Sequence, residues 1–298
     1  MQTFSGWKLL AACCAVTSIL GMGKAGAETI RLGLLPGGET IVRYEISVLR
    51  MALEFMPGDQ TLEIVYLTNT PQQRMLYILE HGVGTSGSEG ETLIDVVVTA
   101  NSPERENRLL QVDVPVTRGL LGNRVLAVRS DWNDHNNLPC NLKELTETIT
   151  IGSGVDWPDT DVFERAGFSV MRTSYTGLWR MLKGGRYDGF NRSIHEVRVD
   201  LAEQKAKGWN FEIAPNLVFS YRQDYFFYVH KDNRDLHARL TAALNAAYGA
   251  GAFMENFNAD PEIQGALSIL QQPNLCRIYL DSPFVTDRLS AIPEQYWE

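Results

Sequence analysis

The sequence lacks the short motifs that mark many common enzyme classes. None of its five histidines forms a His-Glu-x-x-His pair, no Cys-x-x-Cys is present, and neither a Walker loop nor Gly-x-Gly-x-x-Gly follows a predicted strand. Because Gly152 directly precedes Ser153, that serine is not in a Gly-x-Ser-x-Gly nucleophile elbow either. We therefore expect no metal, no cofactor and no enzyme activity. A minor alternative is a cleft dehydratase or hydrolase with Asp156 or Asp159 as general base.

The chain also lacks an apolar run long enough to span a bilayer comfortably. The uncharged segment Leu9–Gly21 follows Lys8 and precedes the small residues Ala25 and Ala27, a pattern typical of a secretory signal peptide. We therefore predict a signal peptide over residues 1–27, export to the periplasm and no membrane insertion of the mature protein. A lipid anchor at Cys13 is the minor alternative, since almost no apolar segment precedes it.

Cysteine is scarce once that peptide is removed. Only Cys140 and Cys276 remain in the mature chain. An even pair in an oxidising compartment favours a disulfide between them, and two buried free thiols are the alternative.

Basic residues are fewer than acidic ones. Removing Lys8 and Lys24 with the signal leaves 25 basic and 36 acidic residues, a net charge of −11 with neutral histidines. Nucleic acids and anionic membrane surfaces attract basic faces, so this balance argues against both as partners. The remaining 271 residues suit two modest lobes better than one core.

Short apolar runs alternate with helical patterns between residues 149 and 201. Three strands are predicted, at Ile149–Ile151, Phe168–Met171 and Tyr187–Phe190. This order indicates a parallel α/β unit, in which ligands bind at the carboxyl ends of the strands. The segments 152–160 and 191–193 are predicted to be loops at those ends.

The same order of elements occurs in the N-terminal part, with strands predicted at Thr29–Leu35, Leu62–Leu67 and Ile94–Thr99. Two further strands, Arg124–Arg129 and Tyr225–Val229, flank the second unit and are expected to form a two-strand hinge. We predict an α/β fold with residues 28–125 and 226–298 in one lobe and residues 126–225 in the other.

The segment DVVVTANSPERENRLLQVDVPV resembles the bacterial extracellular solute-binding proteins of family 3. In that family a strand ending in Asp-x-x leads to Thr/Ser-x-Glu-Arg and then to a strand with a proline. The matching residues here are Asp95, Ser102, Glu104, Arg105 and Pro115. The turn at Gly152–Gly154 and the run Gly185–Asp188 match too, so the resemblance covers essentially the whole mature chain. It implies a type II periplasmic-binding-protein fold, a monomer, and delivery of a small solute to an ABC transporter permease.

The resemblance also implies a ligand site between the lobes. Arg105 would bind a carboxylate with both arms of its guanidinium, and Ser153 would bind an anion beside the backbone N–H groups that follow Gly152. Trp157 would line the wall. The other candidate ligand residues are Asn101, Ser102, Gly154, Asn191 and Arg192.

The sequence departs from the family pattern in two places. The loop that usually provides an ammonium-binding Asp reads Asn191-Arg192-Ser193, and Leu35–Gly38 replaces an aromatic-Pro-Phe stretch. If Arg192 points into the cleft with Arg105, the site would favour a dianion or a plain carboxylate. A sensory protein that docks to a membrane receptor is the alternative function.

Each candidate residue also has a structural alternative. Arg105 could pair with Glu104 or Glu106 on an exposed turn, with Arg108 competing for the ligand role. The remaining alternatives are an ion pair of Arg192 with Asp188 or Glu196, a plain turn at Gly152–Gly154, a packed Trp157, and a helix cap at Asn101 or Ser102.

Overall fold

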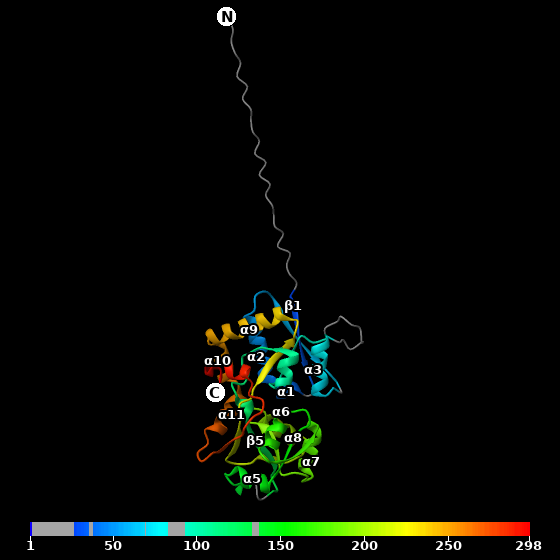
Figure 1. Cartoon of the computed structure of the whole chain (residues 1–298), viewed down its shortest axis with the longest axis vertical. Coiled ribbons are helices and arrows are strands. Elements are labelled where there is room, and N and C mark those ends of the chain that lie inside the picture. Colours follow the sequence, from blue (N-terminus) through cyan, green and yellow to red (C-terminus); the bar gives the residue numbers. More distant parts are fainter. Residues whose placement is uncertain (2–26, 36–37, 69, 83–92, 133–136) are drawn as a thin grey trace.

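The computed structural model describes residue 1 and residues 27–35, 38–68, 70–82, 93–132 and 137–298 (Figure 1). Residues 2–26 of the predicted signal peptide, with the alternative anchor at Cys13, therefore lie outside the described residues. Pro36 and Gly37, from the segment Leu35–Gly38 that departs from the family pattern, lie outside them as well.

The first sheet contains five strands in the described residues, in the spatial order β2-β1-β3-β11-β4. Their bounds are β1 Glu28–Leu34, β2 Gln60–Tyr66, β3 Val96–Ala100, β4 Leu109–Gln111 and β11 Tyr225–His230. Strand β1 is parallel to β2 and β3, whereas β11 runs antiparallel to β3 and β4. All five residues of β3 are buried, as expected for a central strand covered on both faces.

The second sheet contains seven strands in the described residues, in the order β12-β10-β5-β8-β6-β7 with β9 paired to β5. Their bounds are β5 Asn123–Arg129, β6 Thr150–Gly154, β7 Ser169–Thr173, β8 Gly189–Ser193, β9 Phe211–Ile213, β10 Leu217–Ser220 and β12 Cys276–Tyr279. Strands β7 and β8 are both parallel to β6, which confirms the predicted parallel unit.

Helices cover both sheets. The first sheet is contacted by α2 Arg43–Glu54, α3 Gln72–His81, α4 Pro103–Arg108 and α9 Arg234–Gly249. Helices α1 Gly38–Ile41 and α10 Ala252–Ala259 pack on α2, and α12 Asp287–Ala291 contributes Leu289 to the core beside β3 and β11. The second sheet is packed by α5 Leu142–Thr148, α6 Pro158–Arg165, α7 Tyr175–Lys183 and α8 Val197–Ala206, while α11 Pro261–Leu270 contacts both α10 and α8. Short 3₁₀ helices lie at Leu120–Gly122 and Glu294–Tyr296. Each sheet with its helices forms one lobe, the first above and the second below in Figure 1. The predicted two-lobe α/β architecture is thus observed.

Two crossings of the chain between the lobes are tied together by one carboxylate. Asp224, in the returning crossing, accepts hydrogen bonds from the backbone N–H and the hydroxyl of Thr117 in the outgoing one, at 2.9 and 2.7 Å. The strands expected to form the hinge lie inside the sheets instead: β5 is central to the second sheet and β11 belongs to the first. The crossings therefore lie between β4 and β5 and between β10 and β11.

The C-terminal part crosses between the lobes as well, which differs from the predicted lobe ranges. Strand β12 pairs in parallel with β10, so residues 276–279 belong to the second sheet although 226–298 was assigned to the first lobe. The physical reason is that β10 otherwise has a free edge, which β12 covers. Strand β5 likewise begins at Asn123, inside the range 28–125.

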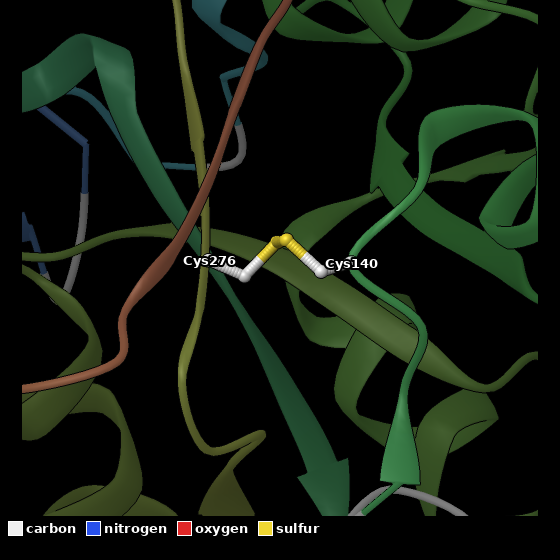
Figure 2. The surroundings of a disulfide bond; sticks show 2 residues. All are labelled: Cys140 and Cys276. Atoms are coloured by element: carbon white, nitrogen blue, oxygen red, sulfur yellow. A yellow bond between two sulfur atoms is a disulfide. The ribbon is translucent and has the colours of Figure 1, made fainter.

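The predicted disulfide between Cys140 and Cys276 is present, with 5.6 Å between the two Cα atoms (Figure 2). It joins the segment before α5 to the first residue of β12, and so attaches the C-terminal crossing to the second lobe. No helix in the described residues has the length and apolar character needed to cross a membrane.

Candidate functional site

A cavity of about 740 Å³ lies between the two lobes. Its lining from the first lobe includes Leu35, Ile41, Thr70, Pro71, Gln72, Ala100, Arg105 and Tyr225. Its lining from the second includes Arg124, Gly154 to Asp159, Thr173 to Thr176, Arg192, Glu196, Glu203 and Lys207. The volume is in the range of small-molecule sites, and contributions from both lobes make this the place where a solute would be enclosed.

Arg105 faces this cavity from helix α4. Strand β3 ends at Ala100, and Ser102 then caps α4 by accepting a hydrogen bond from the backbone N–H of Arg105 at 3.3 Å. The guanidinium donates to the Ala100 carbonyl oxygen at 2.5 Å and to Gln72 Oε1 at 3.0 Å. These neutral acceptors fix its orientation.

The charge of Arg105 is not paired with a carboxylate in the described residues. The side chain is only 4% exposed, and this burial lowers its pKa from the ordinary value. Two partners were considered for Arg105 from the sequence. Glu104 binds Arg108 instead, which also binds Glu80, and Glu106 accepts a hydrogen bond from Thr286. A buried guanidinium without a carboxylate partner is a favourable site for an anion, because the anion would replace the water that the guanidinium loses on burial.

On the opposite wall, Arg124 of β5 binds Asp159 of α6. The hydroxyl of Tyr221 also donates to Asp159, and it accepts from Arg124 Nε at 3.1 Å. All three side chains are buried. Both contacts are made by Asp159 Oδ1, so this oxygen belongs to a buried structural network.

Arg192 of β8 lies beside this network in a second one. Its Nε donates to Asp200, and its Nη2 is 3.0 Å from Glu196 Oε2. Tyr225 donates to Glu196 Oε1 and Tyr175 to Asp200 Oδ1, both at 2.6 Å. Asp200 thus pairs with Arg192 and Tyr175, whereas Glu196 pairs with Arg192, Tyr225 and also Arg124, whose Nη1 is 3.8 Å from Glu196 Oε2.

The electrostatics keep Glu196 ionised. Burial alone would raise the pKa of Glu196, but the charges of Arg192, His195 and Arg124 lower it to about 2. Arg192 is only 3% exposed, so its charge is balanced inside the protein. Arg192 lines the cavity, and the alternative pairing with Glu196 is observed, so its charge is balanced by neighbouring carboxylates.

Four of the eight predicted ligand residues line the cavity, and four do not. Arg105, Gly154, Trp157 and Arg192 line the cavity. Asn101, Ser102, Ser153 and Asn191 are buried and are not among the cavity-lining residues of the described chain.

The second group serves the framework. Asn101 accepts from the Asp224 backbone N–H at 3.1 Å and donates to the Phe284 carbonyl oxygen at 3.2 Å. Ser153 accepts from Asn191 at 3.1 Å and from Thr160 at 2.7 Å. None of these contacts faces the cavity.

The predicted loop 191–193 is strand in the structure, and the predicted loop 152–160 is strand through Gly154, a turn at residues 155–157 and helix from Pro158. Gly152 to Gly154 complete β6, and Asn191 to Ser193 complete β8. Since alternate strand residues face opposite sides, Arg192 reaches the cavity while its two neighbours do not. The two glycines are needed for close packing: a Cβ at Gly152 would meet the Tyr187 ring at 2.2 Å, and one at Gly154 would meet Trp157 at 2.4 Å.

Gln72, Arg124 and Tyr225 line the cavity although they were not among the predicted site residues. Arg124 was the first residue of a predicted strand, and its neighbours Val125 and Leu126 are apolar. A charged side chain in an otherwise apolar strand indicates either a buried ion pair or a binding site, but the sequence does not show which.

In the described residues, no group of three or more His, Cys, Asp or Glu side chains could hold a metal ion.

No protein-family model matches the sequence, and no curated protein matches it. Solved structures do match. A histidine kinase sensor domain similar to periplasmic binding proteins has a TM-score of 0.55 at 16% identity, covering 77% of this chain and 94% of that one. An ancestral arginine-binding protein bound to arginine has 0.54 at 16%, covering 77% and 96%. An arginine-specific periplasmic binding protein of Salmonella typhimurium has 0.52 at 14%, covering 78% and 98%. These similarities confirm the two-lobe periplasmic-binding-protein fold.

Proposed function

We propose that the protein is a periplasmic solute-binding protein that captures a small carboxylate-bearing solute between its lobes and delivers it to a membrane transporter. The observation that supports this most directly is Arg105, a buried guanidinium at the cavity wall with no carboxylate partner in the described residues. A ligand carboxylate would supply the missing charge through two parallel N–H···O bonds.

The residues around Arg105 support a bound solute enclosed by both lobes. Ala100, Gln72 and Tyr225 come from the first lobe, and Trp157 and Arg124 face them from the second. Closure of two lobes on a solute removes water from both, so each polar contact becomes stronger. The protein would act as a monomer, and a permease would bind its closed form.

The test is a ligand panel on the purified mature protein. Thermal shift and calorimetry would be run with amino acids, mono- and dicarboxylates and amines, and a ligand at 100 times its Kd adds about 2.7 kcal/mol of stability. We expect carboxylates to bind and simple amines not to bind.

Two variants identify the residue responsible. Arg105→Ala should weaken carboxylate binding by about 10- to 100-fold, because a charge-assisted contact contributes roughly 1.5–3 kcal/mol. Arg108→Ala is the matched control, since Arg108 is on the same helix and binds Glu80 and Glu104. Equal binding by wild type and Arg105→Ala would overturn the proposal.

Export is proposed with it. A mature N-terminus at Glu28 in protein recovered from the periplasm is expected, and a diacylated Cys13 found by mass spectrometry would contradict the soluble form. A sensory role is the second candidate, because a histidine kinase sensor domain is among the similar structures. Cross-linking that captures a sensor kinase rather than a permease would favour sensing.

A further inference from the structure

The guanidinium of Arg192 lies among three aromatic rings and two carboxylates. Its Cζ is 5.1 Å from the centroid of the Trp157 ring, 5.5 Å from that of Tyr175 and 5.4 Å from that of Phe190. Cations are attracted to aromatic faces at such distances. We call the set formed by these rings with Glu196 and Asp200 the Arg192 cage.

The carboxylates of the cage complete the coordination of this cation. Asp200 accepts from Arg192 Nε, and Glu196 Oε2 is 3.0 Å from Nη2. Both acids are buried, Asp200 fully and Glu196 with 1% exposure. Two acids at the edge of a cation and aromatic rings around it form the kind of site that recognises a guanidinium or ammonium group.

We infer that Arg192 is a built-in occupant of a cation-binding cage, and that it restricts the cavity to ligands that carry a carboxylate for Arg105 and no cationic group. The inference rests on the proposed function, because it assumes that the cavity binds a solute. Arg192 would then be the residue that determines specificity: it occupies the rings and acids that a ligand cation would need.

The other acids among the described residues that line the cavity do not replace the occupied cage. Asp159 is buried and receives both Arg124 and Tyr221. Asp156 and Glu203 are partly exposed, so water screens their attraction for a ligand cation. Lys207, which is exposed and lines the same cavity, opposes such a cation.

The body of the ligand should be largely apolar. Leu35, Ile41 and Leu121 line the cavity together with aromatic side chains. A carboxylate with an alkyl or aryl body satisfies both features, whereas the matching amino acid would bury an unpaired ammonium group.

The first test compares matched ligands on the wild-type protein by calorimetry. The pairs are 3-phenylpropionate with phenylalanine, 4-methylpentanoate with leucine, and glutarate with glutamate. We expect the member without the ammonium group to bind at least about tenfold tighter, equivalent to about 1.4 kcal/mol. Equal or tighter binding of the amino acids overturns the inference and leaves the proposed function standing, whereas no binding by either member of any pair overturns the proposed function.

Asp156 and Glu203, the partly exposed acids at the rim of the cavity, need their own control. The double variant Asp156→Asn/Glu203→Gln should keep the order of affinities within each pair. If an amino acid binds wild type tighter and loses that advantage in the double variant, the ammonium site is at the rim and the inference is wrong.

The second test empties the cage and asks whether a free cation refills it. Arg192→Ala should gain thermal stability from millimolar guanidinium chloride relative to sodium chloride at equal concentration, because guanidinium binds only the folded cage. Arg172→Ala is the control, since exposed Arg172 binds Asp161 and Glu164 and leaves no enclosed cage. A folded Arg192→Ala protein without this rescue overturns the cage. If the variant does not fold even with guanidinium, the wild-type ligand pairs decide the question.

Discussion

His195 and Glu45 join the two lobes directly: His195 Nε2 lies 3.1 Å from Glu45 Oε1, and both side chains are buried. Glu45 is on α2 of the first lobe, and His195 follows β8 of the second. The other ring nitrogen, Nδ1, is 2.7 Å from Ser193 Oγ. This contact is therefore one of the links between the lobes, and it includes a titratable ring.

This contact predicts a pH-dependent stability. Burial alone would lower the pKa of His195, but the hydrogen bond and charge of Glu45, with Glu196 and Asp224 nearby, raise it above the ordinary value. A group with a raised pKa stabilises the folded state fully below about 6.5, its unfolded value, and loses this contribution as pH rises through the higher folded value. The Tm advantage of wild type over His195→Gln should therefore shrink as pH rises above about 6.5. Parallel Tm curves for the two proteins would contradict it.

The disulfide should contribute strongly to stability. Cys140 and Cys276 are 136 positions apart, so the bond removes much of the freedom of the unfolded chain. The double variant Cys140→Ser/Cys276→Ser should lose about 2–5 kcal/mol in urea unfolding. Reductant should destabilise wild type similarly and leave the double variant unchanged; an effect of reductant on the variant would point to another cause.

Gly152 should not tolerate a side chain. A Cβ there would meet the Tyr187 ring at 2.2 Å, so Gly152→Ala should cost about 1–3 kcal/mol through overpacking. Gly249→Ala is the control, because no atom lies within 4 Å of its added Cβ and it ends helix α9. Urea unfolding of both variants measures the difference, and equal stabilities would refute the packing argument.

The buried pair of Arg124 and Asp159 should be far more sensitive than an exposed one. Arg124→Met leaves Asp159 buried with only Tyr221 as a hydrogen-bond donor, which should cost about 3–5 kcal/mol. Arg172→Met, at an exposed pair, should cost at most about 1 kcal/mol. Comparable losses in the two variants would show that burial is not the deciding factor.

The strands of the second lobe could be predicted from their apolar runs, but their ends could not. At Gly152 and Asn191 the polar and glycine residues suggested loops, whereas the structure continues the strands. The ladders decide this: Gly154 pairs with Thr173, and Arg192 pairs with Val125. Such hydrogen bonds join residues distant in sequence and outweigh local propensity.

Two predictions made from the sequence, the disulfide and the lobe ranges, were inconsistent with each other, and the disulfide alone indicates where β12 lies. Cys140 was assigned to the second lobe and Cys276 to the first, although a disulfide requires their Cα atoms to lie within about 7 Å. The bond brings residue 276 to the second lobe, where β12 pairs with β10. The identity of Arg105 as the unpaired cation, by contrast, depended on the positions of Glu80 and Arg108, which no local pattern fixes.

Strand β12 also governs how this protein can be dissected. A fragment made of residues 123–220 alone would expose the outer edge of β10 and a thiol at Cys140, and one ending before residue 276 would lose α12 as well. Exposed strand edges recruit other chains. The second lobe is therefore incomplete without residues 276–279, and we expect denaturation of the intact polypeptide to proceed as one cooperative step.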